Sequence, residues 1–244
     1  EFHIMITTGA PIVIDGDWKH FFPDVDVSCD VKTDVILGEQ LGHGAYSNVF
    51  CWYGNPGFVL KVGTSKADME KEVAVNAHIA EFLDTPQKCV AHNIMPCLGG
   101  FAGTCLGTPV YTLVMPLYSS PWQNSRNLWG TTTLDTLIRV YVCVSNAVTT
   151  LHSMGVTHND IKPPNILKTW NNQYVLTDFG ISSVKGKKPL EPTSTYLHTR
   201  YYRSPELLFT QYNSTPEVCA AIDYSAADWW ALGISLIEVA YISV

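Results

Sequence analysis

The stretch that decides the fold is His158-Asn159-Asp160-Ile161-Lys162-Pro163-Pro164-Asn165, with Asp178-Phe179-Gly180 beginning eighteen residues after Asp160. Transfer of a phosphoryl group to a hydroxyl requires a carboxylate that orients the attacking oxygen and accepts its proton, and Asp160 suits that role. The same chemistry requires oxygen ligands for a Mg²⁺ ion on the phosphates, which suits Asn165 and Asp178. The spacing therefore predicts a phosphoryl-transfer site that uses a divalent metal.

A glycine-rich segment precedes this stretch, and Leu41-Gly42-His43-Gly44-Ala45-Tyr46-Ser47-Asn48-Val49 has the form G-x-G-x-x-S-x-V. Because glycine has no Cβ, backbone N–H groups around Gly42 and Gly44 can approach phosphate oxygens. We expect these glycines and Leu41 to bind the nucleotide; the alternative is an ordinary hairpin turn. A dinucleotide-binding fold is disfavoured, because it needs a helix directly after the glycines and the chain continues here as strand-like sequence.

A lysine follows on the third strand-like piece, in Val59-Leu60-Lys61. A buried lysine there would hold the α- and β-phosphates, and it would need an anionic partner. The next helix offers Glu70 and Glu72, of which Glu72 is preferred because apolar neighbours follow it. The alternative is a surface lysine on an edge strand.

In this combination and order the motifs resemble those of the protein kinase family, over residues 35 to 244, and Ser204-Pro205-Glu206 is a variant of the family's A-P-E. The resemblance implies an α+β bilobal fold with a small β-rich N-lobe and a mainly helical C-lobe. It also implies ATP and Mg²⁺ as cofactors, a protein substrate, Asp160 as the base, and Lys61 with Glu72 as the catalytic lysine–glutamate pair.

Serine/threonine specificity is implied by the same resemblance. Lys162, which can neutralise charge on the transferring group, resembles the lysine of serine/threonine kinases, and Thr199 occupies the position of their threonine. The segment Thr199-Arg200-Tyr201-Tyr202-Arg203-Ser204-Pro205-Glu206 is similar to T-R-W-Y-R-A-P-E of the cyclin-dependent and MAP kinase group. Asp228 resembles the helix acid that fastens the catalytic-loop backbone.

An adenine site is also implied by resemblance, because residues 113–118 resemble the segment that joins the two lobes. Met115 would be the gatekeeper, the Pro116 carbonyl would accept a hydrogen bond from adenine and the Tyr118 N–H would donate one. The apolar residues that sandwich the ring would be Val49, Val59 and Leu167.

Hydrophobic periodicity predicts the secondary structure around these motifs. Residues 35–41, 47–53 and 57–62 are predicted as three strands of an antiparallel meander. Residues 66–82 and 134–154 are predicted as helices, and a last helix begins near Ala226. The apolar face of the first helix is assigned to Met69, Val73, Ala77 and Ala80. Residues 97–109 are interpreted mainly as glycine-rich turns.

Three regions are expected along the 244 residues. Residues 1–34 form an extension that leans on the body, with a short strand at 11–14. Residues 35–118 form the N-lobe and hinge, and residues 119–244 the C-lobe. The chain stops inside the helix that follows Asp228, so the C-lobe is expected to be incomplete.

Composition excludes several other classes of protein. The formal net charge is -7 and no long basic run is present, which argues against nucleic-acid binding. The longest apolar run, residues 231–244, contains Glu238 and is too short to span a membrane. Seven scattered cysteines without a CxxC pair indicate a reducing, intracellular compartment, cytoplasm or nucleus.

Two departures from the family pattern keep other functions open. Asn159 stands where an arginine usually pairs with a phosphorylated loop, so activity is predicted not to depend on phosphorylation within 193–196. Asn76 occupies a normally apolar position of the first helix. A pseudokinase or ATP-binding scaffold is the first alternative and a small-molecule phosphotransferase the second. Retention of the lysine, both acids and the amide favours an enzyme.

Overall fold

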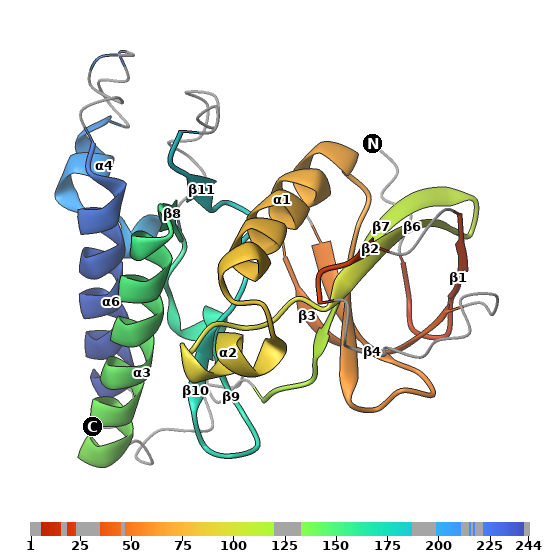
Figure 1. Cartoon of the computed structure of the whole chain (residues 1–244), viewed down its shortest axis with the longest axis horizontal. Helices are drawn as coiled ribbons and strands as arrows, with labels where there is room; N and C mark the ends of the chain where they lie inside the picture. Colours follow the sequence, from red (N-terminus) through yellow and green to blue (C-terminus); the bar gives the residue numbers. More distant parts are fainter. Residues whose placement is uncertain are drawn as a thin grey trace. The chain divides into compact units, whose positions relative to one another are not determined.

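The computed structural model describes residues 6–15, 19–22, 35–44, 47–119, 133–186, 199–210, 215, 217 and 222–241 (Figure 1). The chain divides into two compact units. Unit 1 comprises Glu1–Lys88 and Pro96–Leu117, and unit 2 comprises Cys89–Met95 and Tyr118–Val244. Among the helices in these described ranges, none has the length and apolar character needed to cross a membrane.

Unit 1 is built on a seven-stranded antiparallel sheet in the order β1-β3-β4-β5-β7-β6-β2. The predicted meander is confirmed, because β3, β4 and β5 follow one another in chain order and pair as neighbours. The strands are β1 (Pro11–Ile14), β2 (Lys19–His20), β3 (Val35–His43), β4 (Ser47–Trp52), β5 (Phe58–Gly63), β6 (Gly99–Cys105) and β7 (Thr108–Pro116).

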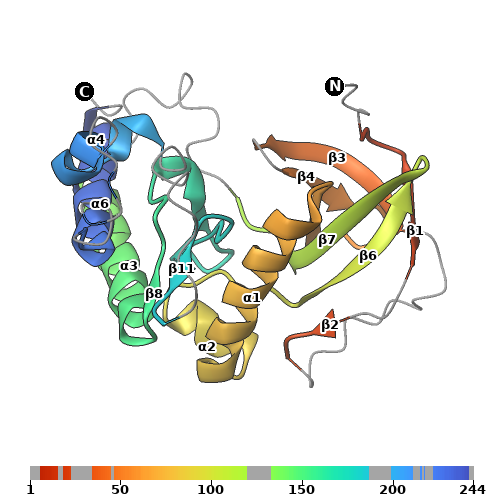
Figure 2. The same ribbon diagram turned by 90° about the horizontal axis from the view of Figure 1, so that it is seen from above.

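Strand β1 closes this sheet into a ring, because it pairs with β3 on one edge and with β6 on the other (Figure 2). Ile12 is opposite Val35 in one pairing and opposite Cys105 in the other, and its side chain is fully buried. The strand predicted at 11–14 is therefore present. It is part of the sheet itself, whereas the sequence suggested an extension that leans on the body.

The interpretation of residues 97–109 mainly as turns is wrong, because most of them form β6 and the start of β7. A Cβ on Gly103 would lie 2.5 Å from the Val13 carbonyl oxygen and 2.8 Å from Ile12 Cγ2. A Cβ on Gly100 would lie 2.7 Å from the Thr112 carbonyl oxygen. These glycines serve close approach between strands, which is the other common reason for glycine in a β-sheet.

Helix α1 (Lys66–Phe82) has the predicted bounds and begins at the N-cap Ser65. Its buried face differs from the predicted one: the buried residues are Met69, Glu72, Val75, Asn76 and Ile79. The other three residues of the predicted face are only partly buried. Because a carboxylate and an amide belong to the buried face, the apolar pattern alone pointed to a rotated one.

Unit 2 contains α3 and α6, which pack against each other (Figure 1). Helix α3 begins after the N-cap Thr133 and ends at Ser153, and Gly155, two residues later, has a φ of 74°, the left-handed conformation that commonly follows a helix end. The helices are α3 (Leu134–Ser153), α4 (Pro205–Thr210) and α6 (Tyr224–Tyr241). Helix α2 (Pro86–Ala91) begins in unit 1 and ends in unit 2. The strand pairs are β9 (Ile166–Lys168) with β10 (Tyr174–Leu176), and β8 (Val156–Thr157) with β11 (Ser183–Val184).

Candidate active site

Asp160 lies in the loop between β8 and a 3-10 turn at Pro163–Asn165, and both of its carboxylate oxygens have partners. The Thr199 hydroxyl donates to Oδ1 at 2.8 Å. Lys162 Nζ lies 2.7 Å from Oδ2, and Asn165 Nδ2 donates to Oδ2 at 3.0 Å. The carboxylate is thereby held in one orientation, and one of its oxygens already accepts a hydrogen bond from an aliphatic hydroxyl.

Lys162 connects this carboxylate to the Thr199 hydroxyl. Its ammonium group donates to Thr199 Oγ1 at 2.9 Å while it contacts the Asp160 carboxylate. The side chains of Lys162 and Asp160 are 22% and 10% exposed, so the positive charge lies where water screens it only partly. A negative charge that develops next to Asp160 would therefore be stabilised by Lys162.

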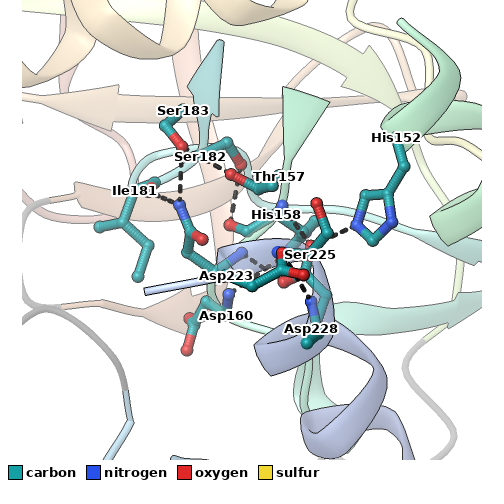
Figure 3. A network of polar contacts seen from close by, with 12 residues as sticks. His152, Thr157, His158, Asp160, Ile181, Ser182, Ser183, Asp223, Ser225 and Asp228 are labelled. Carbon is teal, nitrogen blue, oxygen red and sulfur yellow. Dashed lines mark hydrogen bonds and ion pairs between the residues drawn. The ribbon is translucent and has the colours of Figure 1, made fainter. Parts of the chain in front are cut away.

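The backbone that carries Asp160 is fastened by Asp228 of α6 (Figure 3). The N–H groups of His158 and Asn159 each donate to one carboxylate oxygen of Asp228 at 2.8 Å. His152 Nε2 lies 2.9 Å from the same carboxylate. Asp228 is 2% exposed, so these contacts compensate a buried carboxylate. The expected fastening of the catalytic loop by Asp228 is confirmed.

His158 joins the catalytic loop to the segment before Asp178. Its Nδ1 accepts the Asp160 N–H at 3.2 Å, which assigns the ring proton to Nε2, and Nε2 lies 3.0 Å from the Thr177 carbonyl oxygen. Its ring makes an edge contact with Phe179 at 5.2 Å between centroids. The two motifs that sequence analysis separated by eighteen residues are thus in direct contact.

Asn165 and Asp178 are the predicted metal ligands, and their segments are bonded to each other. The Asn165 carbonyl oxygen accepts the Thr177 N–H at 2.9 Å. Because Asn165 Nδ2 donates to the Asp160 carbonyl and carboxylate, its Oδ1 is turned away from Asp160. An amide oxygen and a carboxylate are hard oxygen donors, so this pair fits Mg²⁺. The ligand role remains a prediction.

In unit 1, Lys61 of β5 is paired with Glu72 of α1. Lys61 Nζ lies 2.6 Å from Glu72 Oε1, and the two side chains are 9% and 5% exposed. Glu70 instead lies 3.7 Å from Lys66 on the exposed face of the helix. The pairing of Lys61 with Glu72 is therefore confirmed over Glu70, while its catalytic role remains a prediction.

The surroundings of this ion pair explain how an amide is accommodated at the buried position of Asn76. The Asn76 side chain donates to the Glu72 carbonyl oxygen at 2.9 Å, so the amide is satisfied within its own helix. Cys97 is close enough to be affected by the pair: burial raises the pKa of its thiol, and the Glu72 charge raises it further. The pair thus lies in a dry environment, where a lone charge is costly.

The glycine hairpin belongs to the β3–β4 pair. Gly42 is opposite Val49, and the Gly44 N–H donates to the Ser47 carbonyl oxygen at 2.8 Å. A Cβ on Gly44 would lie 3.0 Å from that oxygen, so glycine fits the tight turn. Leu41 lies on β3, and residues 45–46 lie outside the described residues.

The residues expected around adenine fall in both units. In unit 1, Val59 is opposite Met115 in the β5–β7 pairing, and both are buried. Val49 and Pro116 are half-buried on the same sheet. In unit 2, Tyr118 is half-buried and burial raises the pKa of its hydroxyl, and Leu167 is half-buried on β9. Contact of these residues with adenine remains a prediction.

Two contacts of unit 2 were not predicted from the sequence. The Tyr202 hydroxyl donates to the Glu238 carboxylate, and burial, followed by this contact, raises the pKa of Tyr202. The available signal was Glu238 itself, an acid within an apolar helical run that needs a partner. The second contact is between Asn159 and the segment after Gly180. Residues 193–196, the subject of the phosphorylation hypothesis, lie outside the described residues.

Several known proteins are similar to this chain. A family model described as the protein kinase domain matches residues 35–243. A mitogen-activated protein kinase kinase, mkk2 of Aspergillus fumigatus, is 31% identical over 210 residues, covering 84% of this chain and 38% of that protein. Serine/threonine-protein kinase 10-A of Xenopus laevis is 29% identical over 236 residues, covering 93% of this chain and 22% of that protein.

A solved structure described as the crystal structure of a kinase domain has the same fold. It superposes with a TM-score of 0.63 at 20% sequence identity, covering 84% of this chain and 63% of that one. This chain therefore spans less than two thirds of the length of each of these three proteins.

Proposed function

Because the chain belongs to the protein kinase domain family, we propose that it transfers the γ-phosphoryl group of ATP to serine or threonine hydroxyls of a protein substrate. The observation that carries the proposal is the set of contacts on Asp160, whose carboxylate is bonded to Lys162, Asn165 and the Thr199 hydroxyl. This arrangement supplies the oriented carboxylate that phosphoryl transfer to a hydroxyl requires.

In the proposed reaction the substrate hydroxyl oxygen forms a bond to the γ-phosphorus. The bond from that phosphorus to the oxygen bridging to the β-phosphate breaks, and ADP leaves. The hydroxyl proton passes to Asp160, whose orientation the contacts with Lys162 and Asn165 support. The Lys162 ammonium stabilises the negative charge on the transferring group.

Lys61 would hold the α- and β-phosphates of ATP, and Glu72 would keep its ammonium group in place. The 2.6 Å contact between them supports this assignment, because a buried lysine without an anion would lose its charge or move to water. The glycines Gly42 and Gly44 would contribute backbone N–H groups to the phosphates, and Leu41 would flank them.

Asn165 and Asp178 would hold Mg²⁺, which neutralises charge on the phosphates when it is bound. The fit of the donor set supports this proposal, since an amide oxygen and a carboxylate suit a hard cation. Asp178 has a φ of 71°, an uncommon backbone conformation for a residue other than glycine. Such conformations concentrate at functional sites, which is consistent with a ligand role.

Serine/threonine specificity is supported by the contact between Lys162 and Thr199 and by the name of one relative, serine/threonine-protein kinase 10-A. A binding scaffold without transferase activity and a small-molecule phosphotransferase are the competing functions. Both are outcomes of the test below, because the first would bind ATP without transfer and the second would not label protein.

The test is transfer of label from γ-labelled ATP to a generic basic protein, with analysis of the labelled amino acids. Asp160→Asn keeps the shape of the side chain but removes the base, and it should lower the transfer rate by about 10² or more. Asp135→Asn is the matched control, because Asp135 is an exposed acid of the same unit, paired only at the surface with Arg139. Equal rates for both variants would contradict the proposal.

A further inference from the structure

The residue next to the proposed base, Asn159, is held in a costly state. Its φ is 68°, in the left-handed region, and only 8% of the residue is exposed. Its Oδ1 is buried and has no hydrogen-bond partner among the described residues. Left-handed backbone and an unsatisfied buried acceptor are both unfavourable, and such strain at a site indicates a function for the residue.

The side-chain amide nitrogen of Asn159 explains why this state persists. Nδ2 donates to the Ile181 carbonyl oxygen at 3.0 Å and to the Ser183 hydroxyl at 3.3 Å. These contacts also set the orientation of the amide, because a flipped amide would put Oδ1 against the Ile181 carbonyl oxygen. Asn159 therefore connects the catalytic loop to the segment that follows Asp178-Phe179-Gly180.

Other contacts join the same two segments, and Figure 3 shows Ile181, Ser182 and Ser183 beside Thr157 and His158. The Ser182 hydroxyl donates to the His158 carbonyl oxygen at 3.0 Å. The hydroxyls of Thr157 and Ser183 lie 2.6 Å apart, within the β8–β11 pairing. Farther along, the Lys185 N–H donates to the Gly155 carbonyl oxygen at 2.8 Å.

All of these contacts are made between neutral groups. Hydrogen bonds between amides, hydroxyls and carbonyls do not depend on an added anion, and salt screens them far less than it screens exposed ion pairs. The segment 181–185 is thus fastened to 155–159 by contacts in which no charged group takes part. Asn159 contributes its side-chain amide to this set, and its backbone N–H, like that of His158, is also bonded to Asp228.

From these contacts we propose that Asn159 is a positioning residue of the kinase. Its amide fastens segment 181–185 to the catalytic loop and so holds the adjacent Asp160 in its working orientation with no phosphate added to the chain. The proposal rests on the proposed function, because it concerns regulation of the same site. It assigns to a neutral side chain the fastening that would otherwise need a charged partner.

The test uses Asn159→Asp, which keeps the shape of the side chain, removes the Nδ2 donor and places a carboxylate oxygen beside the Ile181 carbonyl. We expect kcat to fall about tenfold or more, because a small misplacement of a catalytic group has large effects on rate, while the KM for ATP stays within about twofold. Asn172→Asp is the matched control, since Asn172 is an exposed residue with a φ of 62° in the same unit. It should leave kcat unchanged.

A second variant separates the amide from the backbone strain. Asn159→Gly relieves the strain of the left-handed φ but removes the side-chain amide. We expect it to lower kcat as much as Asn159→Asp does. Ser183→Ala removes the longer of the two contacts and the hydroxyl contact with Thr157, but it leaves the contact with the Ile181 carbonyl, so it should have the smaller effect. A kcat of Asn159→Gly equal to that of the unaltered chain would overturn the proposal.

Two readouts keep this test distinct from the test of function. Amide hydrogen exchange should become faster at residues 181–185 in Asn159→Asp and stay unchanged at residues 166–176. Treatment of the unaltered chain with a phosphatase should leave its kcat unchanged. Unchanged exchange at 181–185, or loss of activity after phosphatase treatment, would overturn the proposal. An unaltered chain that transfers no phosphate refutes the proposed function, and the exchange measurement still decides whether Asn159 fastens the segment.

Discussion

The buried ion pair of Lys61 and Glu72 shows how strongly single residues depend on each other in unit 1. Lys61 Nζ lies 2.6 Å from Glu72 Oε1, and both side chains are almost fully shielded from water. Loss of one partner would remove the opposite charge from a buried group, and breaking a buried pair in this way typically costs about 3–5 kcal/mol. A loss of activity in a variant of either residue therefore has two causes, the missing contact with substrate and the weakened fold.

A double variant separates these two causes. Lys61→Met should abolish transfer and lower the free energy of unfolding by about 3 kcal/mol or more, because the buried Glu72 carboxylate loses the opposite charge of Lys61. Lys61→Met combined with Glu72→Met should regain most of the stability and none of the activity. Lys66→Met, which touches only the exposed pair with Glu70, should change stability by about 0.5 kcal/mol at most. Urea unfolding and the transfer assay measure the two effects.

The outcome that contradicts this argument is recovery of transfer in the double variant. Such a result would mean that Glu72 acts only by balancing charge and that Lys61 does not hold phosphates.

Tyr202 provides a pH-dependent prediction, because burial and its contact with Glu238 raise the pKa of its hydroxyl above the ordinary value. The folded chain then keeps this proton at pH values where the unfolded chain releases it. The stabilisation is fully present below the unfolded pKa of about 10 and is lost as the pH rises above it. Tyr202→Phe removes the titrating hydroxyl.

Unfolding measured between pH 8 and pH 10.5 or so tests this assignment. The stability difference between the unaltered chain and Tyr202→Phe should be constant near pH 8 and shrink above about pH 10. Tyr201→Phe is the control, because it removes the hydroxyl of an exposed tyrosine next to Tyr202 in the chain. A difference that grows with pH would contradict the direction of the shift.

Single residues of the site were predictable where a motif fixes both residue type and spacing. The spacing of Asp160, Asn165 and Asp178 led to their assignment, and the structure brings the Asn165 amide into contact with the Asp160 carboxylate. The partners of Asn159 were not predictable. Every residue has a backbone carbonyl, so the sequence does not show that the carbonyl of Ile181 is the acceptor. The left-handed backbone at Asn159 determines which carbonyl the amide reaches.

At the level of elements, β1 is the addition that changes unit 1 from an open sheet to a closed one. It occupies the edges of β3 and β6 that would otherwise expose unpaired backbone groups. Because β3 leads directly into Gly42 and Gly44, β1 also supports the strand from which the glycine hairpin begins. The segment before residue 35 is therefore expected to contribute to stability.

Gly103→Val tests this contribution. The new side chain would collide with the Val13 carbonyl and Ile12, so the free energy of unfolding should fall by about 1–3 kcal/mol. Gly57→Ala is the control, because nothing lies within 4 Å of a Cβ at Gly57 and its φ is not in the left-handed range. A Gly103→Val variant as stable as Gly57→Ala would show that β1 does not pack against β6 in solution.

Elements were predicted well where periodicity and end signals agree. The bounds of α1 and the start of α3 follow from the N-caps Ser65 and Thr133 and the helical spacing between them and the helix ends. The prediction of the buried face of α1 was wrong because that face contains the polar residues Glu72 and Asn76. Strand β6 was missed because its glycines have the same sequence pattern as a turn.

For the whole molecule, the expected α+β protein kinase fold is confirmed by the family model over residues 35–243 and by the likeness to a solved kinase domain. Unit 1 is mainly a sheet with one long helix, and unit 2 is mainly helical. The chain covers 38% of one relative and 22% of another, so a protein substrate is part of the proposal and is not taken over from those relatives. We expect residues of both units to be required for that activity.

The most direct test of the central claim compares phosphoryl transfer by the unaltered chain and by Asp178→Ala. With γ-labelled ATP, Mg²⁺ and a generic basic protein, the unaltered chain should place label on serine and threonine, and Asp178→Ala should place almost none because a proposed metal ligand is missing. Equal labelling by the two chains, or label on no amino acid in either, would contradict the claim.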